Sequence, residues 1–315
     1  MANILLRSPY FVTVTTAGHL SAQMALTIDG TLRYTILKNA TSNRTVFEIA
    51  SLAKDYYSAT YGGSTGGTID TVAISYVITT FTGLDGTGTN QGSQTAVTHT
   101  GYYGYSDFWS GVNQDFDPDD YELTNTGRSL IIYLPENTAG FAWDMNSGTA
   151  TKATISTTAT SVAATSGNYT WTIERICSAK YTPIKMRFIN KNGIPQDQYF
   201  FLKSVESINT KSETFKRNIF SYSSSNYDTK SHQTQTFNKT GRKRFTLNTD
   251  YLAEAYNEVM EDILLSEYVW IFVSNVIHPV TVVTSSLTKK TSLNDKLIQY
   301  TLEVEDANDI INNIV

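Results

Sequence analysis

The sequence has few charged residues and almost no cysteine. Its 315 residues include one cysteine, Cys177, so no disulfide can form within the chain. Charged residues make up 17% of the chain, whereas a typical soluble protein has roughly a quarter. The four histidines are scattered, and a lone cysteine cannot complete a zinc site. We therefore expect neither a disulfide scaffold nor a zinc centre.

Long apolar segments are also absent. The longest run, residues 268–273 (YVWIFV), is far too short to span a bilayer, so no membrane insertion is expected. The opening residues, MANILLRSPYFVTV, contain too short an apolar run for the core of a signal peptide, which predicts a cytoplasmic origin. The net charge of −5 disfavours nucleic-acid binding by the chain as a whole.

Threonine, serine, glycine, asparagine and 20 tyrosines take the place of the missing charges. Threonine and tyrosine favour half-buried strands, while serine, glycine and asparagine favour turns. The composition therefore predicts a mainly β fold with minor α (α+β). We expect β-sandwich-like domains, each with one short packed helix, and the length is sufficient for two or three domains.

The first part of the chain alternates as a hairpin does. Residues 24–28 and 32–37 flank Asp29-Gly30, a strong turn signal. Helical spacing of apolar residues predicts a short helix over 48–58, and residues 71–81 predict a long strand.

The middle of the chain is biased towards threonine, serine and alanine. Lys152 is the only charged residue between 147 and 170. This pattern is typical of a linker or of a small strand-rich inserted subdomain, and the high β-propensity favours the subdomain. We therefore expect three regions: 1–146, 147–176 and 177–315.

The last third predicts strands around one amphipathic helix. Strands are expected at 184–189 and 197–202, joined by a turn at 190–193, and a closing strand at 297–304. Asn248 or Thr249 suits the N-cap of the helix. Its predicted apolar stripe consists of Leu252, Ala255, Val259 and Ile263, with Glu254, Glu258 and Asp262 facing away.

The candidates for chemistry are weak. The segment Gly62-Gly63-Ser64-Thr65-Gly66 matches G-x-S-x-G, but a helix is predicted before it and a strand after it, the reverse of a nucleophile elbow.

Asp115, Asp117 and Asp119 alternate, yet the sixth and twelfth positions counted from Asp115 depart from an EF-hand loop. A solvated acidic loop is preferred to a looser calcium site. We expect no catalytic residue, cofactor or metal, and hence no enzyme.

Two clusters are candidates for binding. The aromatic one suits a sugar-stacking platform, and also a core or subunit interface; it consists of Tyr102, Tyr103, Tyr105, Phe108 and Trp109. The stretch 211–244 is polar and locally basic without the dense run of a nucleic-acid arm. It predicts a solvated loop or an intersubunit assembly arm that orders on assembly, with Lys211, Lys216, Arg217, Lys230, Arg242, Lys243 and Arg244 as its cations.

Both ends of the chain resemble structural proteins of tailed bacteriophages. At the start the resemblance lies in RSPYFVTVTTAG, LTIDGTLRYTILK and VFEIASLAKDY. Near the end it lies in FINKNGIPQDQYFFLKS, LNTDYLAEAYNEVMEDILLSEYVWI and LTKKTSLNDKLIQYTLEVEDAND. The chain is also faintly similar to the β-sandwich-plus-helix hub of distal tail proteins. The middle, about 83–170, carries no resemblance.

The resemblance implies a virion structural protein that assembles in the host cytoplasm. The expected role is a ring-forming subunit of the tail tip, baseplate or adaptor, with copies of itself and other virion proteins as partners. The predicted strands at 11–14 and 297–304 lie near the chain ends and suit strand addition across subunits. The alternatives are a receptor- or carbohydrate-binding module, a neck- or capsid-associated protein, and a hydrolase hidden in a β fold.

Overall fold

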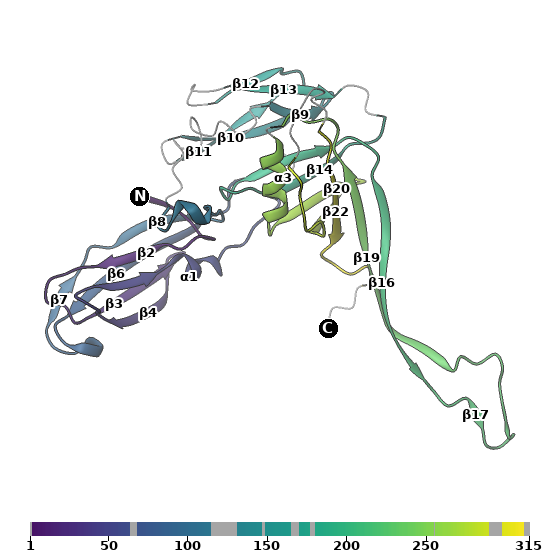
Figure 1. Ribbon diagram of the computed structural model, residues 1–315, viewed down its shortest axis with the longest axis horizontal. Coiled ribbons are helices and arrows are strands. Elements are labelled where there is room, and N and C mark those ends of the chain that lie inside the picture. The colour runs from purple at the N-terminus through teal and green to yellow at the C-terminus, as the bar shows by residue number, and fades with distance from the viewer. Residues whose placement is uncertain are drawn as a thin grey trace.

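The computed structural model describes residues 2–63, 68–114, 131–146, 149–164, 170–176, 180–254, 256–289 and 298–311. Strands account for 52% and helices for 8%, which confirms a mainly β fold with minor α. Figure 1 shows an N-terminal lobe (2–114), a middle module (131–176) and a C-terminal lobe (180–311), from which a long ribbon projects. No helix in these ranges is long and apolar enough to cross a membrane.

The N-terminal lobe is a sandwich of two sheets. The larger sheet has the order β1-β8-β6-β3-β4, with β7 paired to β6. Its strands are β1 (Ala2–Leu5), β3 (Ser21–Ile28), β4 (Thr31–Asn39), β6 (Val72–Phe81), β7 (Asn90–Ser93) and β8 (Val97–Tyr102). Strands β2 (Phe11–Val14) and β5 (Thr45–Glu48) form the smaller sheet, and helix α1 (Ala50–Lys54) follows β5. Met24, Phe47 and Ile78 belong to the buried cluster between the layers.

Local signals in this lobe predict its elements well. Asp29 and Gly30 have φ angles of 48° and 75°, as a two-residue hairpin turn requires. The Asp29 carboxylate also accepts a hydrogen bond from the Ala73 N–H at 2.9 Å. Helix α1 confirms a short helix within 48–58. Side chains alternate between the two faces of β3 and β6, and those on one face are buried. Short 3-10 turns, η1 (Leu84–Gly86) and η2 (Phe108–Ser110), occupy two of the loops.

The middle module is built from two small sheets. One is the hairpin of β10 (Gly140–Asn146) and β11 (Thr149–Ile155). The other has the order β12-β13-β9, from β12 (Ser161–Ala163), β13 (Thr170–Ile176) and β9 (Ile131–Pro135). Strands β9 and β10 therefore pair with strands of the segment 147–176. The predicted boundary after residue 146 had placed both of them in the first region. The cause is non-local: β9 and β13 pair in parallel across a long connection, which no local pattern reveals.

The C-terminal lobe is one antiparallel seven-stranded sheet with a helix packed on it. The order is β15-β14-β20-β21-β22-β19-β16. The strands are β14 (Ile184–Ile189), β15 (Pro195–Phe200), β16 (Val205–Lys216), β19 (Thr234–Asn248), β20 (Val269–Val273), β21 (Val276–Val282) and β22 (Thr301–Asp306). Helix α3 (Tyr256–Leu265) shares the buried cluster of Phe188, Leu247 and Ile271. The predicted turn at 190–193 is confirmed, with Gly193 at a φ of 78°.

The prediction for this helix was partly wrong. Asn248 ends β19, and the helix begins at Tyr256. Its fully buried side chains include Met260 and Ile263, and Asp262 is buried instead of facing away. Val259 is half-buried and packs against both the C-terminal core and the middle module. Because α3 is covered on two sides, its buried arc is wider than one amphipathic stripe.

The predicted strand addition at the chain ends is also wrong for the C-terminal strand. Strand β22 lies inside the sheet, with β21 on one side and β19 on the other. Its backbone groups are therefore already paired. The outer strands of this sheet are β15 and β16.

Candidate functional site

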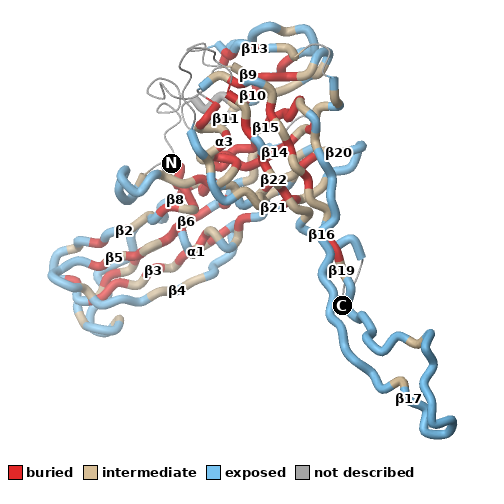
Figure 2. Tube along the Cα trace, turned by 45° about the vertical axis from the view of Figure 1, so that its right-hand side comes forward, coloured by how far each residue is buried: buried red, intermediate tan, exposed pale blue. Residues whose placement is uncertain are grey.

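The basic stretch forms a long antiparallel ribbon, here called the arm (205–248). Strands β16 and β19 pair from Val205 and Thr246 to Lys216 and Thr234, with a register shift between Lys211 and Glu213. At the tip β17 (Phe220–Ser221) pairs with β18 (Asn226–Tyr227). The 12 residues of β16 span roughly 40 Å at the usual rise per residue. Figure 2 shows the arm leaving the sheet and running away from both lobes. The segment is thus solvated as predicted, but it is a pair of strands and not a loop. Its pairing within the single chain also differs from the predicted arm that orders only on assembly.

Nearly every residue of the arm beyond its base is exposed. From 205 to 239, only Ile219 and Ser231 are even half-buried. A two-stranded ribbon has no second layer to cover it, and such a hairpin is marginally stable in water by itself. The arm is held at its base by the seven-stranded sheet, through the pairing of β19 with β22.

The predicted cations of the arm divide into two groups. Those at the base are paired within the chain: Arg242 Nε lies 2.6 Å from Asp309 Oδ1, Lys243 Nζ 2.7 Å from Glu206 Oε1, and Arg244 3.7 Å from Glu303. The outer group, Lys211, Lys216, Arg217 and Lys230, forms no ion pair with any described residue. Arg242 and Arg244 therefore tie the arm to the lobe, and Lys243 joins its two strands. In the outer group Arg217 donates to the His232 carbonyl at 3.2 Å, and the lysines are exposed.

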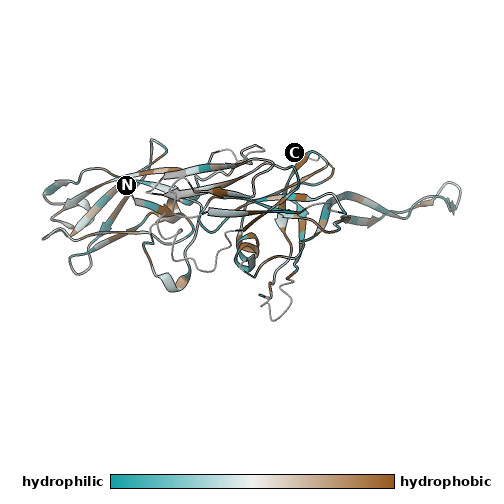
Figure 3. Cartoon of the chain, turned by 90° about the horizontal axis from the view of Figure 1, so that it is seen from above, coloured by the Kyte–Doolittle hydropathy of each residue, from teal (hydrophilic) through white to brown (hydrophobic). Residues whose placement is uncertain are grey.

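Large apolar side chains also line the arm. Phe215 and Phe237 make an edge-to-face contact across the ribbon, with ring centroids 5.7 Å apart. Phe220 and Tyr222 make another at the tip, 5.2 Å apart, and Tyr222 is 81% exposed. Figure 3 shows hydrophobic and hydrophilic residues interspersed along the arm. Exposed apolar groups gathered on a projecting element are typical of an interaction surface.

The predicted aromatic cluster is divided between core and surface. Tyr102 and Tyr103 are buried, and Tyr105 is half-buried. Phe108 and Trp109 are 89% and 92% exposed, and their rings touch each other edge to face at 5.6 Å. The turn η2 presents this pair to solvent. The cluster is therefore no single platform.

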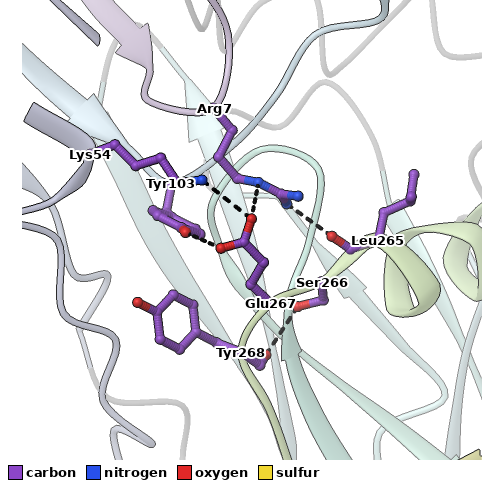
Figure 4. A network of polar contacts seen from close by, with 7 residues as sticks. All are labelled: Arg7, Lys54, Tyr103, Leu265, Ser266, Glu267 and Tyr268. Carbon is purple, nitrogen blue, oxygen red and sulfur yellow. Dashed lines mark hydrogen bonds and ion pairs between the residues drawn. The ribbon is translucent and has the colours of Figure 1, made fainter. Parts of the chain in front are cut away.

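Tyr103 belongs to a contact between the two lobes. Its ring stacks on Tyr57, with centroids 4.4 Å apart, and meets Tyr268 edge to face at 5.1 Å. Its hydroxyl donates to Glu267, which follows helix α3 (Figure 4). Burial, together with that hydrogen bond, raises the pKa of the Tyr103 phenol above its ordinary value.

Glu267 is the centre of this inter-lobe contact. Arg7 Nε and Lys54 Nζ, both from the N-terminal lobe, lie 3.2 and 3.4 Å from its Oε1 (Figure 4). Arg7 also donates to the Leu265 carbonyl at 3.0 Å. Partial burial opposes ionisation of Glu267, but Tyr103, Arg7 and Lys54 together hold the pKa of its carboxyl below the ordinary value of 4.5.

Arg187 makes a second and deeper contact among the three parts. Its side chain is completely buried on β14, and it forms a two-point ion pair with Asp197 of β15, at 2.6 and 2.8 Å. Its remaining donors reach the Tyr61 carbonyl at 2.6 Å and the Gly63 carbonyl, both in the N-terminal lobe. The guanidinium lies 4.5 Å from the Tyr61 ring centroid and 5.1 Å from that of Phe141 in the middle module.

The weak candidates for chemistry remain without support. Ser64, the acidic segment from Asp115 to Asp120, and Cys177 lie outside the described residues. Within those residues, no three His, Cys, Asp or Glu side chains are grouped to hold a metal ion. The carbonyl of Gly63, in the G-x-S-x-G segment, binds Arg187 and thus has a structural role.

A small cavity of about 80 Å³ lies between the middle module and the C-terminal lobe. Its wall is mixed: Phe141, Trp171 and Val259 are apolar, whereas Asn190 and Asp197 are polar. The indole Nε1 of Trp143, in the same wall, is buried without a hydrogen-bond partner among the described residues. The space suits a few water molecules rather than an organic substrate.

Three comparisons with known proteins were made for this chain. No family model, curated protein or solved structure matches it. Function is therefore argued from the surfaces described above.

Replacing Arg187 tests the deeper contact between the parts. Arg187→Met leaves Asp197 buried without its main partner, and we expect a loss of about 3–5 kcal/mol in the free energy of unfolding, measured by urea denaturation. Lys185→Met is the matched control, because Lys185 approaches Asp197 only to 3.7 Å, and we expect a much smaller loss. Equal losses in the two variants would contradict the role assigned to Arg187.

The Glu267 contact predicts a dependence on pH. A pKa lowered by folding favours the folded state while the carboxyl is ionised, and this contribution is lost as the pH falls below about 4.5. Because Glu267 is 46% exposed, Glu267→Gln is expected to cost about 1 kcal/mol or less at pH 7. Urea denaturation across pH 3 to 7 should show the difference from wild type disappear at acidic pH. A difference that stays constant would exclude an ionic origin.

Proposed function

We propose that this chain is a structural subunit of a tailed-bacteriophage particle, a virion protein that acts by self-assembly and without turnover. The observation that carries the proposal is the arm, an ordered ribbon whose residues from 205 to 239 are almost all exposed. Exposure of the apolar rings of Phe215, Tyr222 and Phe237 to water leaves their hydrophobic surface unburied in a monomer. A subunit that contacts a neighbour can bury them.

The organisation of the body supports the same proposal. Arg187 and Glu267, the polar groups that link its parts, have protein partners and hold the lobes together. Among the described residues, neither of the two lines the clefts found. The arm can therefore transmit a contact from a neighbour to a body whose parts are joined by specific interactions.

The assignment to a phage particle rests on the segment resemblance at the two chain ends. On that basis we propose a ring-forming tail tip, baseplate or adaptor subunit, with copies of itself and other virion proteins as partners. A neck or capsid-surface position is the alternative within the same class. In each case the virion is the proposed location.

Immunogold electron microscopy of phage particles from the source culture tests this proposal. Antibody against the recombinant chain is expected to label the distal tail. Label at the neck or capsid would keep the structural role and reject the tail-tip position. Particles without label, both intact and disrupted, would reject the proposed function, because disruption removes any masking of the epitope.

A receptor- or carbohydrate-binding module is the second candidate, favoured by the exposure of Phe108 and Trp109. A polar cleft begins at Asp107, directly before this pair, and is also lined by Tyr105, Glu258 and Glu261. Aromatic faces beside carboxylates suit stacking and hydrogen bonding to a sugar. However, Asp107 and Glu261 are already paired, with Lys191 at 2.7 Å and Lys289 at 2.6 Å.

The variant Trp109→Ala separates the two candidates. Because Trp109 is 92% exposed, we expect no change in melting temperature, whereas Trp171→Ala, at 7% exposure, should lower it clearly. On a glycan array, the structural proposal predicts no retention of the wild type above background. If the wild type binds a glycan on the array, and Trp109→Ala loses this binding without a change in melting temperature, the chain is a binding module instead.

A further inference from the structure

The arm and the rest of the chain carry opposite charges. Residues 205–248 hold eight of the 24 basic residues and three of the 29 acidic ones, so the net charge of the arm is near +5. The remaining chain keeps 16 basic and 26 acidic residues, and its net charge is near −10. The net charge of −5 is therefore the sum of a positive arm and a more strongly negative remainder.

At the base of the arm Arg242 and Arg244 pair with carboxylates of the same chain, but the outer part of the arm extends away from them. Figures 1 and 2 show that it points away from both lobes. Lys211, Lys216 and Lys230 are exposed, and none forms an ion pair with a described residue. These lysines are accessible to a complementary surface on another molecule.

Charge also decides how two copies can meet. A symmetric contact of one arm with another would place two positive ribbons side by side, which costs free energy. A contact of one arm with the body of a second copy pairs opposite charges and buries the exposed rings of Phe215, Phe237 and Tyr222. Such a contact uses two different surfaces and repeats from copy to copy, closing into a ring where the rotation allows.

We infer that the arm docks on the acidic body of a second copy of this chain, head to tail, and that this contact is the ring interface. The inference rests on the proposed function and adds the partner surface and the polarity of the contact. Long-range attraction between the two surfaces is screened by salt, so the association should weaken as ionic strength rises.

Charge reversal on the arm tests this inference. The variant Lys211→Glu/Lys216→Glu/Lys230→Glu changes three exposed lysines that make no ion pair in the described chain. The control, Lys38→Glu/Lys180→Glu/Lys203→Glu, changes three exposed lysines outside the arm and alters the net charge equally. Lys38 Nζ donates to the Val46 carbonyl at 3.0 Å, so the control is used only if its melting temperature equals that of the wild type. Analytical ultracentrifugation should show self-association of the wild type and control, and a dissociation constant higher by roughly tenfold or more for the arm variant.

Cross-linking then identifies the contact. Wild-type chains labelled with nitrogen-15 are mixed with unlabelled chains and treated with a carbodiimide, which joins lysine to carboxylate directly. Mass spectrometry should find mixed-isotope links from Lys216 or Lys230 to carboxylates outside residues 205–248. Thermal melting of all variants checks that each is folded, and we expect no large loss for the arm variant, because its lysines are exposed and make no ion pair with a described residue.

Three outcomes would overturn the inference. They are a wild type that stays monomeric at all concentrations, an association that the arm variant retains, and arm-to-arm links alone. Retention of the monomeric wild type on a DNA column, lost in the arm variant, would assign the arm to nucleic acid instead. If immunogold labelling finds the chain on phage particles but the purified protein stays monomeric, the proposed function stands and only this contact is rejected.

Discussion

The burial of the Arg187 guanidinium is the constraint on which the arrangement of the three parts depends. A charged group without contact with water must have its donors satisfied and its charge balanced. Asp197 balances the charge, carbonyls of the N-terminal lobe accept the remaining N–H groups, and Phe141 of the middle module faces the planar group. One side chain therefore requires all three parts to be in place.

The polar groups of this protein fall into two sets with different tasks. Buried or half-buried ones, such as Arg187 and Glu267, join the parts of one chain. Exposed ones on the outer arm, such as Lys216 and Lys230, have no ion pair in the described chain and can act between chains. The base of the arm links the two sets, since Arg242 and Arg244 pair with Asp309 and Glu303 of the lobe. The arm is thus attached to the sheet that contains Arg187.

Part of the candidate site could be predicted from composition. The basic, polar character of 211–244 marks it as unable to form a core, so an exposed interaction element was foreseeable. Its ribbon form was not, because the register of β16 against β19 pairs residues up to about 40 positions apart. The division of the aromatic cluster could not be predicted for a similar reason: Tyr103 and Trp109, six residues apart, belong to a buried inter-lobe contact and to an exposed turn.

By itself, the sequence determined the β-rich class, the hairpin at Asp29-Gly30, the turn at 190–193 and the presence of two short helices. These depend on backbone preferences and on side-chain alternation over a few residues, which are local properties. Tertiary structure alone decided which strands pair across the middle module, that β22 lies inside its sheet, and that α3 is covered on two sides. It also decided that Arg187 is buried. Each of these depends on contacts between distant segments, whose free energy no local window contains.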